Sequence, residues 1–437
     1  DLHSFPTRRS SDLGNLVDLG IGLTWAEASG VAPALEKGAV ILEGALSNVV
    51  VLDLTRVLAG PFCSMMMADM GAVVIKIENP KGGADERSMG PFKEGVSAYS
   101  MNLNRNKKAV TLNLKDPKGK GIFLEMLEKA DVVLENFRPG TMEKLGLGYE
   151  DLKKVNPGIV YGAISGFGHT GRYSKRPGYD IIAQAMGGLM STTGWPGGEA
   201  TRTGTAMGDV LGGLSCAIGV LAALNSRART GQGQKVDIAL VDSVVASLEI
   251  INMIYFVEGR VPERIGNRYE STYPYDSFRA SDGSLVIGAG NNKLWQDLAR
   301  MMGREDLLQD PRFGETRDRV AHHEELRGIV EDWTSRQTVK EIHEKLDRAG
   351  VPCAPIYSID QVTSDPHIAE DREMFVECEH PVAGRLKLTG SHLKLSGTPA
   401  SIRTPAPELG QHNNEVYGSM LGYTAEQVAE LEREGVL

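Results

Sequence analysis

Short apolar runs alternate with amphipathic stretches from Asn48 onward. The run VVVLDL comes first, a helical stretch PFCSMMMADM follows, and AVVIKIE is the next apolar run. Pro61 stands where helices often begin, and Gly71 stands where they often end. This pattern predicts a strand–helix–strand unit, in which a crossover helix joins two parallel strands.

The same alternation continues along the first half of the chain. GKGIFLEMLEKA leads into ADVVLENF, YEDLKKVN leads into GIVYGAIS, and QKVDIAL forms one further strand pattern. Such alternation predicts an α/β fold with a Rossmann-like, doubly wound parallel sheet and helices on both faces. Two long apolar segments, beginning at Asp209 and at Val241, are predicted to be buried helices.

The pattern changes after Glu258. Residues 236–269 read as a helix followed by a polar linker rich in Gly and Pro. Residues 270–390 contain a hairpin with an Asp-Gly turn, charged amphipathic helices and further strands, so we expect a smaller α+β domain there. The large domain is assigned to residues 46–235, completed by the segment at about 395–437.

The N-terminal residues are set aside. Residues 1–13, DLHSFPTRRSSDL, have no periodicity and resemble a translated sequencing adapter, so we treat them as an artefact. Residues 14–45 are helix-compatible in places and have none of the three regions of a signal peptide. They remain unassigned.

Composition narrows the function classes. The net charge of −10 argues against a nucleic-acid partner, which needs a clustered basic surface. No apolar run is expected to reach the length of a membrane span, so no membrane partner is expected. The four cysteines are widely spaced and form no C-x-x-C motif, which argues against a metal site or disulfide framework and favours a cytoplasmic location.

Asp209 is the candidate reactive group, because it stands among glycines before the apolar run 210–224. Capping this helix at its N-terminus would alone explain an Asp here. A nucleophile is the second interpretation. The helix dipole would keep the carboxylate ionised even when desolvated, and nearby amides could stabilise an oxyanion. An ionised, partly buried carboxylate can attack an acyl carbon. The two roles are compatible.

The glycine-rich stretch GFGHTG, Gly166–Gly171, matches the G-x-G-x-x-G pattern of dinucleotide sites. Such a site needs a helix to open at the last glycine. Here Pro177 and Gly178 interrupt any helix, and no acidic residue completes the pattern. A dinucleotide site is therefore disfavoured.

A basic stretch interrupts the otherwise acidic chain. It is either a solvated surface or a phosphate contact for an anionic cofactor, and composition does not separate the two. Its members are NRNKK at Asn104–Lys108 together with Lys115, Lys118 and Lys120.

Ordered blocks from Asn48 to the C-terminus resemble the class III CoA-transferases, a group that includes the α-methylacyl-CoA racemases. The blocks are LDLTRVLAGPFCSMMMADMGAVVIKIENP, NRNKK, ADVVLENFRPGTMEKLGLGYEDL, ISGFGHTG, RPGYDIIAQAMGGLMSTTG and TGQGQKVD. They are most similar to the succinate–hydroxymethylglutarate CoA-transferase type. The resemblance implies an interlocked, intertwined homodimer. It also implies that no cofactor or metal is bound permanently and that coenzyme A and acyl-CoA are substrates.

The resemblance also implies a mechanism in which an aspartate becomes acylated. The carboxylate attacks the donor thioester, the CoA thiolate returns to form an aspartyl-CoA thioester, and the acceptor acid then takes the CoA. The family's nucleophile matches Asp209. The expected donor is succinyl-CoA and the expected acceptor is a small carboxylic or dicarboxylic acid. We expect the loop around Arg268–Tyr275 to select the acceptor.

CoA-contacting positions carry over by the same resemblance. Lys144 replaces an arginine, which keeps the charge and loses the bidentate geometry. Asn79 stands where an arginine is usual, and Lys81 is a possible replacement for that charge. The remaining matched positions are Leu112, Asn113, Leu114, Lys115, Asn136, Phe137 and Arg138.

Three further positions bear on specificity. Leu58 and Ala59 match the entrance of the active site, and some oxalate-specific enzymes carry a glutamine at the position of Leu58. Formyl-CoA:oxalate transfer is therefore not expected. Racemases have a histidine where this chain has Tyr179, and an ordinary tyrosine, with a pKa near 10, exchanges α-protons poorly at neutral pH. Racemisation is the alternative function. Asp180 is expected to orient a neighbouring carboxylate or loop, or to cap the helix IIAQAMGGLM.

Overall fold

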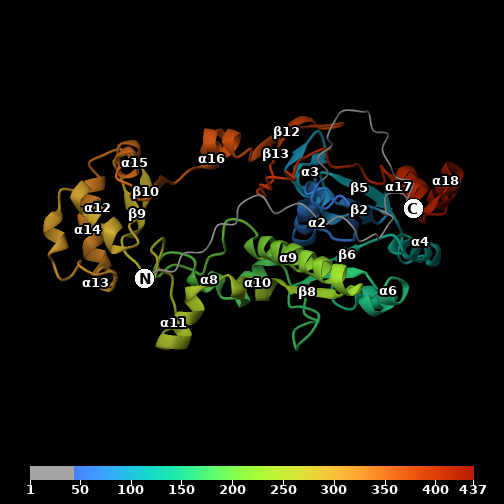
Figure 1. Cartoon of the computed structure of the whole chain (residues 1–437), viewed down its shortest axis with the longest axis horizontal. Helices are drawn as coiled ribbons and strands as arrows, with labels where there is room; N and C mark the ends of the chain where they lie inside the picture. Colours follow the sequence, from blue (N-terminus) through green and yellow to red (C-terminus); the bar gives the residue numbers. More distant parts are fainter. Residues whose placement is uncertain (1–43) are drawn as a thin grey trace, which may run out of the picture. The chain divides into compact units, whose positions relative to one another are not determined.

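The computed structural model describes residues 44–437 (Figure 1). The adapter-like residues 1–13 and nearly all of the unassigned residues 14–45 lie outside this described range.

A six-stranded parallel sheet forms the centre of the larger domain. Its strand order is β5-β2-β1-β6-β7-β8. Counted along the chain, these parallel strands follow the order 3-2-1-4-5-6 of doubly wound dinucleotide-binding folds. The predicted α/β fold is confirmed. The strands are β1 (Val50–Asp53), β2 (Val73–Glu78), β5 (Lys107–Thr111), β6 (Val132–Glu135), β7 (Val160–Ser165) and β8 (Lys235–Ala239).

Helices cover both faces of this sheet, because successive side chains of each strand point to opposite faces. Val51 lies in the core shared with α2 (Ala59–Asp69) and α9 (Met207–Thr230). Its neighbour Leu52 lies in the opposite core. The elements of that second core are α4 (Pro117–Leu127), α6 (Tyr149–Val155), α17 (Asn413–Leu421) and α18 (Ala425–Arg433). In Figure 1 the C-terminal helix α17 lies beside α4.

Short elements follow the carboxyl ends of the strands. The insertion after β2 holds η1 (Asp85–Ser88), a two-stranded hairpin and α3. The other elements are β3 (Phe92–Lys93), β4 (Val96–Ser97), α3 (Ala98–Leu103), α5 (Thr141–Lys144), α7 (Asp180–Met186) and α8 (Leu189–Thr192).

Helix α9 approaches its neighbours closely. A Cβ placed on Gly213 would lie 2.6 Å from the carbonyl oxygen of Ala59, so only glycine lets α2 and α9 pack at this distance. By length and composition alone α9 also passes as a membrane-crossing helix. The apolar run 210–224 is itself shorter than a membrane span, and α9 reaches this length because it continues to Thr230. Cys216 and Val220 of this helix are buried in the core.

The segment predicted as a buried helix from Val241 forms two helices, α10 (Leu240–Ala246) and α11 (Ile250–Glu258). The prediction of burial is wrong for α11 within one chain. Phe256 is 73% exposed and Val257 is 75% exposed.

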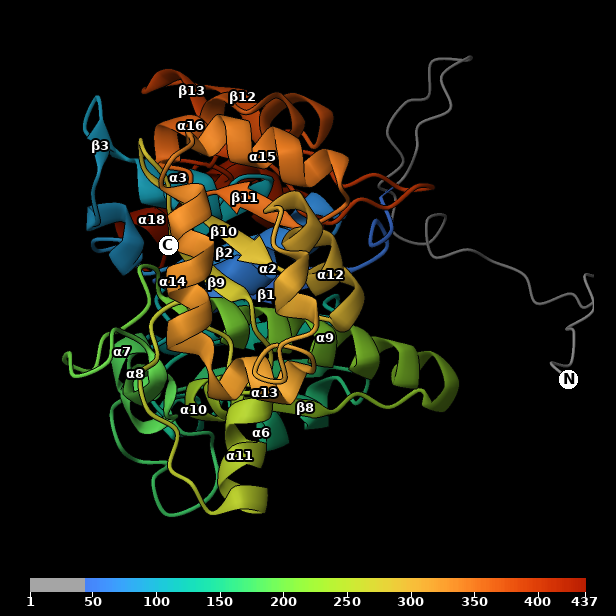
Figure 2. The ribbon, with the colours of Figure 1, turned by 90° about the vertical axis from the view of Figure 1, so that its left-hand side faces the viewer.

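The smaller α+β domain contains an antiparallel sheet of order β11-β10-β9. Asp282 and Gly283 lie in the loop between β9 and β10, as predicted. Figure 2 shows the surrounding helices in front of this sheet, and Trp295 and Phe278 are buried between them. The elements are β9 (Tyr275–Arg279), β10 (Ser284–Gly288), α12 (Asn292–Met301), η2 (Glu305–Leu308), α13 (Thr316–Ala321), α14 (His323–Thr334), α15 (Val339–Arg348) and β11 (Cys353–Pro355).

The chain then forms a second hairpin that belongs to a different core. Leu388 and Ala383 of this hairpin pack with Met101 of α3. The core of the smaller domain thus ends near Cys353, and the hairpin packs on the large domain. The remaining elements are α16 (Ile359–Ser364), η3 (His367–Asp371), β12 (Phe375–His380) and β13 (Gly384–Thr389).

Candidate active site

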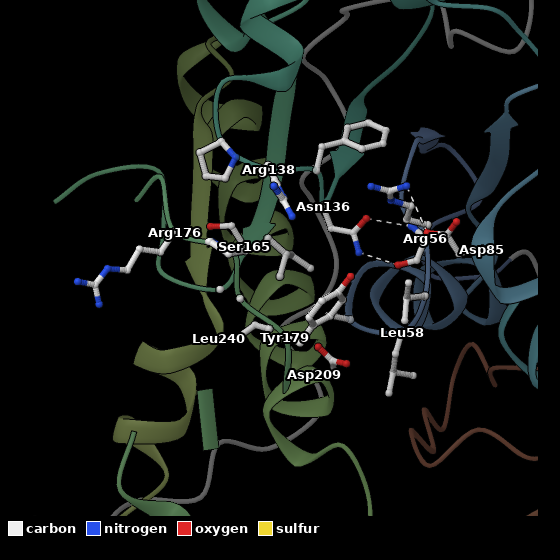
Figure 3. Close-up of a pocket in the computed structure, with 18 residues that line it drawn as sticks. Arg56, Leu58, Asp85, Asn136, Arg138, Ser165, Arg176, Tyr179, Asp209 and Leu240 are labelled. Carbon is white, nitrogen blue, oxygen red and sulfur yellow. Dashed lines mark hydrogen bonds and ion pairs between the residues drawn. The ribbon is translucent and has the colours of Figure 1, made fainter. Parts of the chain in front are cut away.

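A cavity of about 130 Å³ opens at the carboxyl edge of the parallel sheet, where β1 and β6 lie side by side. The winding of the sheet reverses between these two strands, so the loops that follow them diverge and leave a crevice where α/β folds bind ligands. Figure 3 shows the cavity. Its lining comes from the loops after β1, β6 and β7 and from α9, with Asp209 among the lining residues.

Arg56 and Asn136 join the two loops beside this crevice. The backbone N–H of Arg56 donates to Oδ1 of Asn136 at 2.9 Å, and Nδ2 of Asn136 donates to the Arg56 carbonyl oxygen at 2.7 Å (Figure 3). The Arg56 guanidinium pairs with Asp85 at 3.2 Å and lies 5.4 Å from the ring centre of Phe137. These contacts connect the loops after β1 and β6 directly.

Asp209 is the third residue of α9, so the prediction that it caps this helix is wrong. The helix begins at Met207, and its N-cap, Ala206, makes no side-chain capping bond. Asp180 caps the helix instead, since its Oδ1 accepts the backbone N–H of Gly208 at 2.7 Å and that of Asp209 at 3.4 Å. The carboxyl of Asp209 is left to line the cavity.

Of the two roles expected for Asp180, the contacts fit the first, which is to orient a neighbouring carboxylate or loop. It does not cap α7, which begins at Asp180 itself after Tyr179 at the N-cap. Its second carboxylate oxygen accepts a hydrogen bond from Gln184 at 2.8 Å. This bond and the bonds from α9 fix the carboxylate of Asp180 beside that of Asp209.

Burial raises the pKa of Asp209 to about 7, and the negative charge of Asp180 adds to the effect. The expectation that the helix dipole would keep this carboxylate ionised despite desolvation is wrong, because desolvation and the neighbouring charge outweigh it. Near neutral pH the group exists in both protonation states. It can therefore supply a carboxylate whose hydration has already been removed.

Tyr99 on α3 does not line the cavity, but Asp209 acts on it electrostatically, and the sequence did not reveal this pairing. Burial raises the pKa of Tyr99 to about 12, and the charges of Asp209 and Glu86 contribute. The tyrosine therefore lies within electrostatic reach of both carboxylates.

The first turn of α2 forms another wall of the cavity. Leu58 and Ala59 line it, as expected from the family resemblance. The backbone N–H groups of Leu58, Ala59 and Gly60 have no hydrogen-bond acceptor within residues 44–437. Free amides at a helix N-terminus favour negative charge, so this wall can stabilise an oxyanion.

Apart from Asp180, which caps α9 and does not line the cavity, the residues expected to contact CoA or substrate fall into two groups. Those that line the cavity are Leu58, Ala59, Asn136, Phe137, Arg138 and Tyr179. Those that do not line it follow β2 or β5 or, for Lys144, end the helix α5 after β6. They are Asn79, Leu112, Asn113, Leu114, Lys115 and Lys144. The strands β2, β5 and β6 are parallel, so the residues that follow them share the carboxyl edge of the sheet with the cavity.

Within the second group, several residues have structural contacts. Leu112 is 2% exposed in the core, and Leu114 packs against the same core. Asn113 donates its backbone N–H to the carbonyl of Val436. Asn79 is exposed and accepts the backbone N–H of Lys81. Lys115 and Lys144 are exposed, so they are the cations of this group that a phosphate could reach.

In the block NRNKK, Arg105 and Lys107 are buried against acids, whereas Lys108 is partly exposed and pairs with Glu415. Arg105 pairs with Asp69 at 2.7 Å, and Lys107 pairs with Asp53 at 3.0 Å. All four side chains are at most 2% exposed. Both expectations for these residues were wrong, because the charge pattern alone does not reveal that buried acids face them.

The stretch GFGHTG does not form a dinucleotide site. The next helix, α7, begins only at Asp180, and Gly166 lies against Gly178 in the intervening loop. His169 instead faces the second core, where its Nδ1 lies 2.9 Å from Nζ of Lys235 and its Nε2 lies 3.5 Å from Glu135. The loop supplies a wall of the cavity rather than a phosphate cradle.

Comparison with known proteins places this arrangement in a family. The model of CoA-transferase family III matches residues 46–413. The chain is 39% identical to the succinyl-CoA–D-citramalate CoA-transferase of Chloroflexus aurantiacus, over 90% of this chain and 98% of that protein. It is 41% identical to the succinyl-CoA:mesaconate CoA-transferase of Haloarcula marismortui (85% and 96%) and 40% identical to the acetyl-CoA:oxalate CoA-transferase of Acetobacter aceti (84% and 94%).

A solved structure agrees with these relatives. The crystal structure of a CaiB/BaiF family protein from Brucella suis superposes with a TM-score of 0.76 at 34% identity, covering 86% of this chain and 100% of that one. The family match and these relatives confirm the resemblance drawn from the sequence blocks. The chain belongs to CoA-transferase family III, and it is a CoA-transferase.

Proposed function

We propose that this enzyme moves CoA from succinyl-CoA to a small dicarboxylic acid and that Asp209 carries the CoA between the two. The observation that carries the proposal is the desolvated carboxyl of Asp209, released from capping by Asp180 and lining the cavity beside β1 and β6. The named substrates of two relatives support it, since each takes CoA from succinyl-CoA to a dicarboxylate.

The first half-reaction loads CoA onto the enzyme. A carboxylate oxygen of Asp209 attacks the thioester carbon of succinyl-CoA, the C–S bond breaks, and CoA leaves as its thiolate. The product on the enzyme is a mixed anhydride of Asp209 and succinate. The thiolate then attacks the side-chain carbonyl carbon of Asp209, which releases succinate and leaves an aspartyl-CoA thioester.

The second half-reaction is the reverse with a different acid. The acceptor carboxylate attacks the thioester carbon on Asp209 and expels the CoA thiolate, forming a second anhydride. The thiolate attacks the acyl carbon of the acceptor, and the carboxylate of Asp209 is regenerated with the new acyl-CoA. Each step exchanges one anionic group for another, so no proton needs to be supplied or removed overall.

The surroundings of Asp209 fit the demands of these steps. Each tetrahedral intermediate places negative charge on an oxygen, and the free amides of Leu58 and Ala59 are suited to stabilise it. The exposed cations Lys115 and Lys144 are suited to bind phosphates of CoA at the same sheet edge. Asn136 and Arg56 hold the loops on which CoA would lie.

Two observations bear on the identity of the acceptor. The loop at Arg268–Tyr275, expected to select it, does not line the Asp209 cavity within one chain. Leu58 argued against formyl-CoA:oxalate transfer, yet one relative is named for transfer from acetyl-CoA to oxalate. An assay should therefore compare citramalate, mesaconate, glutarate and oxalate as acceptors, with succinyl-CoA and acetyl-CoA as donors.

We also propose that the chain forms an intertwined homodimer. The exposed apolar side chains of Tyr255, Phe256 and Val257 on α11 and of Ile218 on α9 support this proposal. Large apolar side chains exposed together usually mark an interface. The cytoplasmic location expected from the cysteine pattern stays a prediction.

The test of the proposed function is to trap the acylated enzyme. Enzyme incubated with succinyl-CoA alone is treated with hydroxylamine or borohydride, and the modified peptide is mapped by mass spectrometry. We expect modification at Asp209, and none in Asp209→Asn. The matched control is Asp85→Asn, because Asp85 is the other carboxylate among the residues that line the cavity. Modification that persists in Asp209→Asn, or an unmodified enzyme that exchanges the α-proton of a 2-methylacyl-CoA, would contradict the proposal.

A further inference from the structure

The loop after β1 contains a strained residue beside the active-site wall. Val57 has φ +68°, in the left-handed region. A β-branched residue rarely adopts this conformation, which persists only where the surroundings hold it. Val57 directly precedes Leu58 and Ala59, whose backbone begins α2 at the Asp209 cavity. The strain therefore sets the direction in which the first turn of α2 leaves the loop.

Two fully buried charges hold this backbone. Nζ of Lys76 and Oε1 of Glu86 lie 2.7 Å apart, and neither side chain has any exposed surface. The other oxygen of Glu86 accepts the backbone N–H of Val57 at 3.0 Å. Lys76 also donates to the carbonyl of Thr55 at 3.0 Å. The pair thus binds the backbone on both sides of Arg56.

The pair is charged in the folded protein. Burial opposes ionisation of both groups, but the charge of Glu86 raises the pKa of Lys76 and the charge of Lys76 lowers the pKa of Glu86. Asn104 adds a hydrogen bond to Glu86 at 3.3 Å. Burial raises the pKa of Tyr99, and the charges of Asp209 and Glu86 both add to this effect.

A buried ion pair is a poor way to gain stability, because the desolvation of two charges offsets most of their attraction. A pair of apolar side chains would fill the same space without that penalty. It could not accept the N–H of Val57 or donate to the carbonyl of Thr55. Lys76 and Glu86 therefore differ from an apolar pair in the hydrogen bonds that they form with the loop backbone.

We propose that the Lys76–Glu86 pair positions the oxyanion-stabilising wall for CoA transfer. By holding Val57 in the left-handed conformation, it aims the first amides of α2 at the acyl group on Asp209. The inference rests on the proposed function, since it assumes that an oxyanion forms there. Lys76 and Glu86 are positioning residues and touch neither substrate.

The test is the double variant Lys76→Met/Glu86→Gln, which leaves no unpaired buried charge. It removes the bond to the Thr55 carbonyl and leaves Val57 with only a neutral acceptor that Lys76 no longer orients. Loss of aligned amide donors should lower kcat by about tenfold or more, while KM for succinyl-CoA changes by less than about threefold. Adding Val57→Gly to this variant should restore at least about threefold in kcat, because glycine adopts a positive φ without strain. Should the double variant not fold, Glu86→Gln alone also keeps the bond from Lys76 to Thr55, so it should lower kcat by only about threefold, with the same rescue by Val57→Gly.

The matched control is the buried pair of Asp69 and Arg105, whose nitrogen and oxygen lie 2.7 Å apart at the other end of α2. The variant Asp69→Asn/Arg105→Met should lower the Tm comparably and leave kcat within about twofold. An equal loss of kcat in both double variants, or an unchanged kcat in Lys76→Met/Glu86→Gln, would overturn the inference. The inference would also be overturned if adding Val57→Gly to the double variant did not restore kcat.

These outcomes are separable from a failure of the proposed function. If Asp209→Asn retains transfer activity, the covalent mechanism itself is wrong. If Asp209→Asn is inactive while Lys76→Met/Glu86→Gln keeps its kcat, only the positioning role is wrong.

Discussion

The carboxylate of Asp180 lies at the N-terminus of the helix that carries Asp209, and its Oδ1 accepts the backbone N–H of Asp209 at 3.4 Å and that of Gly208 at 2.7 Å. The same carboxylate raises the pKa of Asp209. One acid thus orders the helix and keeps the other acid partly protonated at neutral pH.

Removing the charge of Asp180 should lower the pKa of Asp209. In Asp180→Asn the amide oxygen still accepts the N–H of Gly208, so the helix keeps its cap while the repulsion disappears. The acidic limb of the profile of kcat/KM against pH should move down by about one unit or less, because burial, the larger cause, remains. Asp180→Ala should in addition lower the free energy of unfolding by about 1 kcal/mol, measured by urea denaturation. A limb that stays in place in Asp180→Asn would contradict the electrostatic coupling.

The wild-type profile should rise with pH to a plateau above about pH 7, since Asp209 must be ionised to attack. A second carboxyl could mimic this limb, because burial raises the pKa of Glu135 to about 7 as well. Glu135 accepts the backbone N–H of Phe137 and contacts Tyr161 in the second core. Glu135→Gln should therefore keep the limb at its wild-type pH. If the acidic limb disappears in Glu135→Gln, that limb reports the ionisation of Glu135 and not that of Asp209, which would contradict the prediction.

Asp209→Asn should stabilise the protein at alkaline pH. The folded state holds the proton of Asp209 up to about pH 7, whereas the unfolded chain releases it near the ordinary pKa of 3.8. The folded state binds this proton more tightly, so the carboxyl makes folding less favourable as pH rises between these values. The free energy of unfolding of the variant relative to wild type should be about 2–3 kcal/mol higher at pH 8 than at pH 5. An equal difference at both pH values would contradict the raised pKa.

Asn136→Ala should separate the loops after β1 and β6. It removes both hydrogen bonds between the Asn136 side chain and the Arg56 backbone. We expect KM for succinyl-CoA to rise about tenfold and the free energy of unfolding to fall by about 1–2 kcal/mol. The control is Arg56→Ala, which removes the pair with Asp85 and leaves both backbone contacts in place. If KM rises equally in both variants, the two backbone contacts are not what holds the CoA site together.

Phe256→Asp should weaken the proposed dimer. The side chain of Phe256 is 73% exposed on α11 within one chain, and a buried, unpaired carboxylate would oppose association. Sedimentation should show a smaller species for this variant at concentrations where the wild type is dimeric. Val155→Asp, which replaces an apolar side chain that is 40% exposed at the end of α6, serves as the control and should leave the wild-type size. A monomeric wild type, or an unaltered Phe256→Asp, would contradict the interface.

The sequence predicts the fold well because strand and helix periodicity is strong in the sheet region. The α/β alternation from VVVLDL to QKVDIAL predicts five of the six observed strands. It misses β5 at Lys107–Thr111, because the lysines that begin this strand were interpreted as part of a basic stretch. Asp209 was identified as the reactive candidate, but its role in the helix was misassigned. The helix begins earlier, at Met207, and the acid that caps it is Asp180, far away along the chain.

Ion pairs and contacts between residues far apart in the sequence were not predicted. Lys107 and Arg105 read as surface charges, because their partners Asp53 and Asp69 lie on distant segments. Tyr99 gave no periodic or motif signal of its own. The apolar composition of α11 predicted burial, but the helix is exposed within one chain. Sequence periodicity cannot distinguish a helix that its own chain covers from one that a second chain covers.

The most direct test of the covalent account is to follow oxygen atoms from the acceptor. The enzyme turns over succinyl-CoA with an acceptor dicarboxylate labelled with oxygen-18 on its carboxylates, and the peptide containing Asp209 is then analysed by mass spectrometry. Attack on the aspartyl-CoA thioester leaves an acceptor oxygen on Asp209, so this peptide should gain the label, and succinate released in later turnovers should carry it too. Labelled succinate together with an unlabelled Asp209 would show that the two acids react directly, and would contradict the account.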